Sequence, residues 1–351
     1  MIILATILPL KRSHIHFRRP MDPQAPGVAV VLLSWNGIGL IAPCLSSLLE
    51  QTYRNYRVLF VDNGSTDGSA DFVRSTFPGV EVLALTPNCG FARGSNLGIA
   101  EVLKDPSVQY VLLLSIDTRV DAHFIAELVD AAGSDERIGS CQAKTLLMDT
   151  PTIIDAVGIT FDRNGDPIQL GWQEPDNGAY DRKMEVFGAN AGATLYRASM
   201  LREIELFDED FFMYYEDVDL VLRARLAGWK CFFAPKAIVY HKHSHAYGNT
   251  SPFKEYLLNR NRYFYVVKDL PPAMVSIFLM RRARDLAGLI FRLAIRAALF
   301  DRKGMGLQAS RIRPHLHAIA KLPAMFRKRG RIRSKRVISD RDLAGWFVPS
   351  R

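Results

Sequence analysis

The stretch VAVVLLSWNG, residues 28–37, runs from a continuous apolar segment straight into polar residues. Similar apolar runs lie at 57–61, 80–85 and 110–114. Stretches with helical spacing separate these runs, at residues 40–50, 70–76 and 96–103. Short buried strands that alternate with helices are typical of a parallel sheet covered on both faces. We therefore predict an α/β fold with a mostly parallel sheet flanked by helices.

Polar residues follow three of the predicted strands directly. Ser34 and Asn36 follow the first strand, Asp62 the second, and Ser115 and Asp117 the fourth. In open α/β sheets the ligand binds beyond the carboxyl ends of the strands. Asp62 opens a turn-forming stretch, and its carboxylate could either cap that turn or accept a hydrogen bond from a base or ribose. Asp117 could either cap the next helix or bind a hard divalent cation.

Two later segments carry further titratable side chains. Glu216, Asp217 and Asp219 follow the aromatic stretch FFMYY at 211–215. The helix dipole favours acidic residues in a first turn, but this cluster also fits a base with a pKa near neutrality. Histidines at 241, 243 and 245 alternate after an apolar run, so they would point the same way in an extended chain. We predict His241 as a metal ligand and leave the other two as ligands or solvated loop residues.

Charge is distributed unevenly along the chain. From Arg260 to the end there are 22 Lys/Arg and 5 Asp/Glu, which gives +17. The total is +9, so residues 1–259 carry 9 − 17 = −8. A basic tail on an acidic body predicts an anionic partner for the tail. RNA-binding aromatic and basic motifs are missing, so we expect anionic lipid and no nucleic acid. The four scattered cysteines indicate neither disulfides nor zinc, and favour a reducing compartment.

The tail divides into two parts. Residues 271–300 are mostly apolar with interspersed arginines, which predicts a basic amphipathic helix that lies on a membrane and does not span it. Phe278, Leu289, Ile295 and Leu299 fall among its charges, which favours the alternative of a helix packed on the preceding domain. The last forty residues are basic and are predicted to be flexible or bound to a surface. The predicted location is cytoplasmic, peripheral on the inner face of the cell membrane.

Domain limits follow from these patterns. The apolar run at 1–10 is too short to span a bilayer, and it has neither the preceding charges nor the cleavage site of a signal peptide. We predict that residues 1–26 form an extension outside the fold. Residues 27–270 would then be the catalytic domain, and 271–351 the amphipathic, membrane-associating tail.

The order of motifs resembles family 2 glycosyltransferases with the GT-A fold, and more closely their rhamnosyltransferase-like branch. The similarity runs from about Val28 to Leu270. The motifs that carry it are VVLLSWNG (30–37), VDNGSTDGS (61–69), PNCGFARGSNLGI (87–99), LLLSIDTRV (112–120), FGANAGATLYR (187–197), FFMYYEDVDLVLRARLAGW (211–229) and VYHKHSH (239–245).

This resemblance implies roles for particular positions. Asp217 corresponds to the general base, with Glu216 beside it. Asp117 corresponds to the last acid of the D-x-D motif and, with His241, would bind Mg²⁺ or Mn²⁺. The branch often has Asn-Pro-Asp where this chain has Ser115-Ile116-Asp117. The resemblance implies that the nucleotide-sugar contacts Ser34, Asn36, Asp62, Asn88, Arg93, Ser115, Asp117 and Gly192.

The implied activity is inverting transfer of a sugar, rhamnose from dTDP-rhamnose, to a lipid-linked or cell-surface polysaccharide acceptor. Two alternatives stay open at this point. A nucleotidyltransferase would use a similar sheet, but residues 34–39 lack the basic residue of its phosphate loop. A catalytically silent scaffold would bind nucleotide-sugar or membrane, and the presence of Asp62, Asp117 and Asp217 argues against it.

Overall fold

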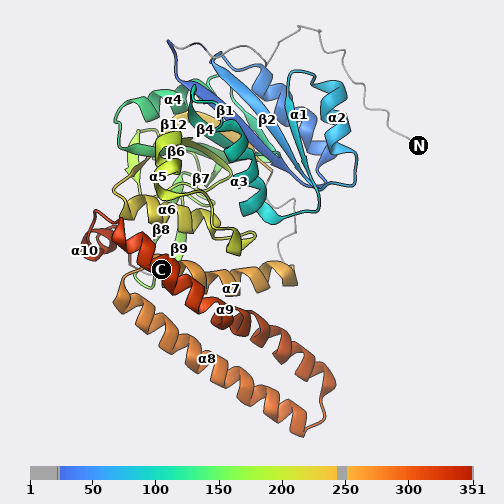
Figure 1. Ribbon diagram of the computed structural model, residues 1–351, viewed down its shortest axis with the longest axis vertical. Coiled ribbons are helices and arrows are strands. Elements are labelled where there is room, and N and C mark those ends of the chain that lie inside the picture. Colours follow the sequence, from blue (N-terminus) through green and yellow to red (C-terminus); the bar gives the residue numbers. More distant parts are fainter. Residues whose placement is uncertain (1–21, 23, 243–250, 350–351) are drawn as a thin grey trace.

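The computed structural model describes residues 22, 24–242 and 251–349 (Figure 1). Its centre is a ten-stranded sheet in the order β10-β12-β6-β11-β4-β1-β2-β3, with β5 paired to β12 and β7 to β6. A separate hairpin joins β8 to β9. The strands are β1 Gly27–Ser34, β2 Tyr56–Asn63, β3 Glu81–Leu85, β4 Val108–Ser115, β5 Thr118–Val120, β6 Ile138–Leu147, β7 Thr150–Ala156, β8 Gly158–Phe161, β9 Pro167–Leu170, β10 Met184–Val186, β11 Ala193–Arg197 and β12 Lys230–His241.

Helices cover both faces of the sheet and extend below it (Figure 1). The helices are α1 Ile38–Leu49, α2 Ser69–Thr76, α3 Gly90–Val102, α4 Phe124–Gly133, α5 Ala198–Ile204, the 3₁₀ helix η1 Glu209–Phe211, α6 Glu216–Leu226, α7 Pro252–Asp269, α8 Pro272–Ala298, α9 Arg302–Ser334 and α10 Asp340–Ala344.

The amino-terminal half forms the predicted parallel sheet. β1 pairs in parallel with β2 and β4, and β2 pairs in parallel with β3. Alternate residues of β1 are buried on opposite faces: Val30 packs with α1, α2 and α4, and Val31 packs with α3, α5 and α6. Because both faces are covered, every position of the strand must be apolar, which explains the continuous run. Beyond β4 the sheet is mixed, since β11 is antiparallel to both β4 and β6.

The carboxyl-terminal helices pack onto the rest of the molecule. α9 contacts α7 and α8, and α8 and α9 form a long hairpin (Figure 1). Met325, Leu343 and Phe347 are buried in the same cluster as Phe264 of α7. Arg329 donates hydrogen bonds to the carbonyls of Val267, Lys268 and Leu270, at the end of α7 where no helical donors remain.

The expectation that the last forty residues are flexible is therefore wrong, and their binding to a membrane surface stays a prediction. Met325, Leu343 and Phe347 of this segment are buried in one cluster with residues of α7. Part of its positive charge is used in hydrogen bonds and ion pairs within the molecule, as Arg329 and Lys328 illustrate. The low average hydrophobicity of this segment did not reveal the packing, because only a few of its residues take part in the buried cluster.

α8 has a buried side and an exposed side, so the expected packing on the preceding domain is present and the membrane contact stays a prediction. Phe278 and Leu289, which fall among its charges, are buried, and Phe278 belongs to the cluster that includes α7. Met280 and Phe291 are each 66% exposed, on a different side of the helix. Within residues 22–242 and 251–349, no helix has the length and unbroken apolar character needed to cross a bilayer.

Candidate active site

Two strand-end loops are tied together beyond β1 and β2. The backbone N–H of Asn36 donates to Oγ of Ser65 at 2.9 Å, and Oδ1 of Asn36 accepts from the N–H of Thr66 at 2.8 Å. Asp62 is buried, and its Oδ1 accepts from the N–H of Ser65 at 3.0 Å. The turn-capping role of Asp62 is therefore present. Asp62 also lies at the carboxyl end of β2, and its contact with the nucleobase stays a prediction.

A cavity of 150 Å³ lies at the carboxyl ends of the central strands. Ser34, Asn88, Ser115 and Asp117, all predicted to contact the nucleotide-sugar, line it. Oγ of Ser34 is buried and has no hydrogen-bond partner among the residues that the structure describes. Buried hydroxyls normally have partners, so a polar ligand group in the cavity would satisfy this one. The remaining lining residues are Leu33, Trp35, Gly37, Leu40, Asn63, Phe91, Ile116 and Met213.

Asn63 is a lining residue that the sequence analysis did not select. Its Nδ2 donates to Oδ1 of Asn88 at 3.2 Å, and its Oδ1 accepts from the N–H of Cys89 at 3.1 Å. Gly64 has φ +79°, and a Cβ there would lie 2.6 Å from the backbone N of Asn88. The two loops therefore approach as backbone against backbone, which only glycine allows. The position of Asn63 directly after Asp62 is the signal that could have identified it.

Asp117 and His241 come together as predicted, with a third residue behind them. Nε2 of His241 lies 3.4 Å from Oδ2 of Asp117, and its Nδ1 lies 2.6 Å from Oδ2 of Asp155. Burial lowers the pKa of His241, but the hydrogen bonds to Asp117 and Asp155 outweigh it and raise the pKa to about 10. Asp155 lies in β7, and no local sequence pattern marked it.

This donor set fits a divalent cation held with help from the substrate. A carboxylate and an imidazole Nε2 supply two protein ligands, and Asp155 orients the ring from the other nitrogen, as carboxylates do behind metal-bound histidines. No group of three or more His, Cys, Asp or Glu side chains positioned for a metal occurs among the described residues. His243 and His245 lie outside those residues. Diphosphate oxygens and water would complete the coordination of Mg²⁺ or Mn²⁺.

Asp217 and Glu216 begin α6, next to the loop that borders the cavity. Oδ2 of Asp217 accepts from the N–H of Ala191 at 3.4 Å, and the neighbouring Gly192 accepts from the N–H of Ser115 at 2.9 Å. The candidate base is thus joined through two residues to the end of β4. Burial raises the pKa of Asp217. Burial and the nearby charge of Asp217 raise the pKa of Glu216 well above its usual range.

The segment before α6 has a strained backbone. Phe212, Tyr214 and Tyr215 have φ of 66°, 69° and 68°, in the left-handed region that non-glycine residues seldom adopt. The buried side chain of Asn261 in α7 donates to the carbonyls of Phe211, Met213 and Tyr214, at 3.0, 2.8 and 2.8 Å. A buried amide that bonds three carbonyls in one segment holds that conformation in place. Asn261 therefore positions the segment before α6, and no sequence pattern marked it.

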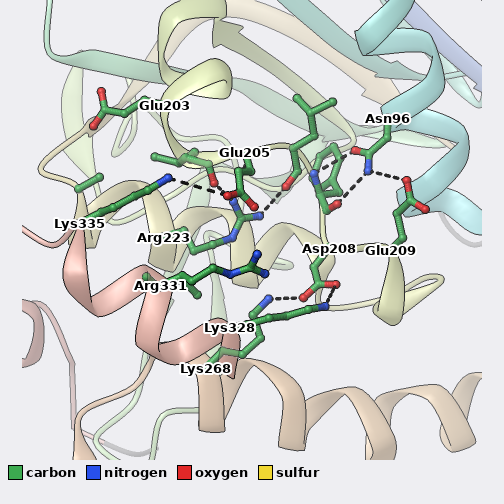
Figure 2. Close-up of a pocket in the computed structure, with 15 residues that line it drawn as sticks. Asn96, Glu203, Glu205, Asp208, Glu209, Arg223, Lys268, Lys328, Arg331 and Lys335 are labelled. Carbon is green, nitrogen blue, oxygen red and sulfur yellow. Dashed lines mark hydrogen bonds and ion pairs between the residues drawn. The ribbon is translucent and has the colours of Figure 1, made fainter. Parts of the chain in front are cut away.

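Ion pairs support the part of the chain around η1, directly before the strained segment. Figure 2 shows Asp208 between Lys268 of α7 and Lys328 of α9, each with Nζ 2.5 Å from a carboxylate oxygen. Lys328 also lies 2.7 Å from Asp210, and Lys268 also contacts Asp219 of α6. The tail is therefore connected by ion pairs to residues before the strained segment, and Lys268 of α7 connects Asp208 to α6 after it.

Two predicted site residues differ in their placement. Gly192 lies beside Ser115, at the border of the cavity. Arg93 lies in α3, where its Nε is 3.8 Å from Glu209 and its side chain is 59% exposed. Arg93 is not among the residues that line the cavity, and its contact with the donor stays a prediction.

Family models match this chain in two overlapping parts. The model of glycosyl transferase family 2 matches residues 29–150. That of glycosyl transferase family group 2 matches residues 110–322, more than half of the chain. The chain belongs to glycosyltransferase family 2. Its membership confirms the predicted glycosyltransferase over the nucleotidyltransferase and the silent scaffold. The match to residue 322 also includes much of the helical tail.

Curated relatives agree with this assignment. This chain is 31% identical over 229 residues to N-acetylglucosaminyl-diphospho-decaprenol L-rhamnosyltransferase of Mycobacterium tuberculosis. The alignment covers 58% of this chain and 72% of the relative. The chain is 22% identical over 221 residues to poly-beta-1,6-N-acetyl-D-glucosamine synthase of Staphylococcus epidermidis, covering 61% of this chain and 50% of that one. The first relative confirms the rhamnosyltransferase-like branch.

Solved structures share the fold of this glycosyltransferase. GalNAc-T7, in a crystal structure with UDP, GalNAc and Mn²⁺, aligns with a TM-score of 0.54 at 16% identity. The alignment covers 70% of this chain and 51% of GalNAc-T7. At that identity the similarity concerns the fold alone, and it confirms the predicted GT-A architecture.

Proposed function

We propose that this glycosyltransferase moves a rhamnosyl residue from dTDP-rhamnose to a hydroxyl of a lipid-linked or cell-surface polysaccharide acceptor, with inversion. One observation carries the proposal. A carboxylate with a raised pKa, Asp217, is connected through Ala191 and Gly192 to the strand-end cavity that contains Asp117. The choice of sugar and acceptor is supported by the Mycobacterium tuberculosis relative, whose name specifies an L-rhamnosyltransferase and a diphospho-decaprenol substrate.

The chemistry requires one base and one site for the departing nucleotide. Asp217 accepts the proton of the acceptor hydroxyl. At the same time the hydroxyl oxygen forms a bond to the anomeric carbon, and the bond between that carbon and the diphosphate breaks. The strand-end loops hold the donor so that the acceptor oxygen and the leaving diphosphate oxygen lie in line with the anomeric carbon. Asp117 and His241 would hold a divalent cation, which would supply positive charge to offset that of the leaving diphosphate. No covalent intermediate is needed for a single displacement.

We further propose that the enzyme works at the cytosolic membrane face, with the hairpin of α8 and α9 on the lipid. Leu299 and Phe300, between the two helices, are 67% and 90% exposed. Arg296, Arg302 and Lys303 flank these two residues. Apolar side chains next to basic ones are typical of segments that bind anionic interfaces. A cavity of 190 Å³ at the start of α8 adds basic character, since it is lined by Arg163, Arg262, Arg281, Arg282 and Arg284.

A donor screen tests the catalytic proposal. The full chain is incubated with Mg²⁺ or Mn²⁺ and a set of nucleotide-sugars, and binding and slow donor hydrolysis are both measured. We expect binding and cleavage of dTDP-rhamnose, with cleavage lost in Asp117→Ala. Asp71→Ala is the matched control, because this carboxylate is 89% exposed on α2. Cleavage of a different nucleotide-sugar would reassign the donor. Absence of binding to every donor would contradict the proposal.

A further inference from the structure

An open groove of 570 Å³ lies between the carboxyl-terminal helices. It is lined by Tyr256 of α7, Leu293 of α8, and Ala309, Ile312 and Leu316 of α9, with Arg313 and His317 of α9 as its polar residues. Leu316 is 55% exposed, whereas Ile312 is 7% exposed at the bottom. The volume is within the range of sites for small organic ligands, roughly 300–1,000 Å³. Apolar side chains that face a concave surface favour an apolar ligand.

The groove leads toward the catalytic segment. Tyr256 follows Phe253 by three residues, so the two side chains lie on the same side of α7. The rings of Phe253 and Phe212 are 5.9 Å apart in a T-shaped contact. Phe212 belongs to the strained segment that ends at Glu216 and Asp217. One face of the first turns of α7 therefore connects the groove to the candidate base.

Cations lie on the wall of the groove and near that segment. The guanidinium of Arg313 is 5.7 Å from the centre of the Tyr256 ring, and that of Arg260 is 5.8 Å from the same ring. Nζ of Lys254 is 5.6 Å from the centre of the Tyr214 ring, two residues before Glu216. Positive charges at these positions would attract phosphate oxygens.

We propose that this groove binds the hydrocarbon chain of a polyprenyl-diphosphate-linked acceptor. The inference rests on the proposed function, which supplies a lipid-linked acceptor. Such an acceptor consists of an apolar chain, then a diphosphate, then a sugar. The protein presents a largely apolar groove with Arg313 on its wall, then Lys254 near the Tyr214 ring, then the segment that carries Asp217. The order of features along the protein matches the order of groups along the acceptor. Neither a second protein chain nor a flat bilayer presents an apolar chain, a diphosphate and a sugar in that order.

Blocking the groove tests the proposal. Ala309→Trp fills it, and Ala320→Trp is the control, because Ala320 is exposed on the same helix but does not line the groove. The probe is radiolabelled decaprenyl phosphate in detergent micelles, added to the full chain without donor. We expect Ala309→Trp to bind it about tenfold more weakly, the loss from excluding a few methylene groups, and Ala320→Trp to match the wild type. Inorganic diphosphate should bind all three proteins equally.

Transfer kinetics provide the second measurement. With dTDP-rhamnose as donor, Ala309→Trp should raise KM for an acceptor with a ten-isoprene chain and leave KM for a two-isoprene acceptor unchanged. Leu316→Asn, at a half-exposed position of the groove, is the substitute variant if Ala309→Trp does not fold. Equal binding of decaprenyl phosphate by wild type and Ala309→Trp would overturn the groove proposal, as would an equal loss in Ala320→Trp.

The two proposals fail in different ways. If donors are not cleaved but decaprenyl phosphate binding depends on Ala309, the proposed transfer is wrong and the groove assignment stands. If a short-chain acceptor is glycosylated and decaprenyl phosphate binding does not depend on Ala309, the transfer stands and the groove assignment is wrong.

Discussion

Oδ2 of Asp155 lies 2.6 Å from Nδ1 of His241, so this imidazole presents its other nitrogen, Nε2, to Asp117 at 3.4 Å. The three residues come from β7, β12 and the turn after β4. A ring oriented from behind by a carboxylate is a better metal ligand than a freely rotating one. The arrangement gives the candidate metal site a third participant that never needs to touch the metal.

Removing that carboxylate should weaken metal binding. We expect Asp155→Asn to lower Mn²⁺ affinity by about 10–100-fold, because the ring loses its charged partner. Titration of Mn²⁺ by electron paramagnetic resonance measures the affinity, and activity should recover at high Mn²⁺. Asp130→Asn is the control, at a carboxylate that is 82% exposed. An unchanged Mn²⁺ affinity in Asp155→Asn would exclude this role.

Metal binding should also strengthen with pH. The pKa of His241 is raised to about 10, so in the metal-free protein the imidazole carries its second proton at neutral pH. Coordination requires the neutral ring, and the proton must leave when the metal binds. We therefore expect Mn²⁺ affinity to rise between pH 6.5 and 9, by up to about tenfold per pH unit. Calorimetry in buffers of different ionisation enthalpy measures the released proton, and a result of zero protons contradicts this prediction.

The two acidic residues at the start of α6 should respond differently to amide substitution. The pKa of Glu216 is raised well above its usual range by burial and by Asp217, so the side chain is expected to be neutral. Glu216→Gln should therefore keep kcat within a few-fold. Asp217→Asn removes the base and should lower kcat by about 10²–10⁴-fold, with donor affinity unchanged. Equal losses in the two variants would mean that the base is wrongly assigned.

The same assignment fixes the sign of the pH dependence. A base must be deprotonated to act, and burial raises the pKa of Asp217 above the range usual for an aspartate. We expect kcat to increase with pH on its acid limb, with a midpoint higher than that of an ordinary aspartate. Initial rates at saturating donor and acceptor from pH 4 to 8 measure it. A rate that falls as pH rises through this range would argue against Asp217 as the base.

Asn261 should matter for both stability and turnover. Asn261→Leu keeps the side-chain size but removes the donors to three carbonyls, and a buried unsatisfied group costs about 1–3 kcal/mol. We expect a lower free energy of unfolding and a lower kcat, because the strained segment before Asp217 loses its support. Urea unfolding and initial rates measure the two effects. Asn259→Leu, which loses one exposed hydrogen bond to Glu255, should change neither.

Membrane binding should depend on the hairpin tip. Leu299→Ser with Phe300→Ser should reduce co-sedimentation with anionic vesicles about tenfold or more, because two exposed apolar side chains are lost. Val337→Ser, at a residue 70% exposed outside the hairpin, is the control. Deleting everything after Leu270 would be a poor test, because it removes Met325 and Phe347 from a shared core. Equal sedimentation of wild type and double variant would exclude the tip as the contact.

Local sequence patterns were sufficient to predict the parallel half of the sheet and the strand-end residues. Continuous apolar runs specify strands that are buried on both faces, and β1, β2, β3 and β4 begin and end within two residues of the predicted runs. Asp62, Ser115 and Asp117 could be chosen because polar residues directly after such runs must lie at the carboxyl edge. Asp217 was found by its motif, since an acidic cluster in a first helical turn is otherwise ordinary.

The folded structure was needed to identify the distant residues that support that edge. Asp155 and Asn261 act by side-chain hydrogen bonds across more than forty residues of sequence, and neither lies in a pattern that local periodicity can detect. The tail was misjudged for the same reason. Its average composition is that of a flexible basic segment, but Met325, Leu343 and Phe347 are buried against α7. Local sequence specifies secondary structure, whereas burial and long-range hydrogen bonds depend on what the folded chain brings alongside each residue.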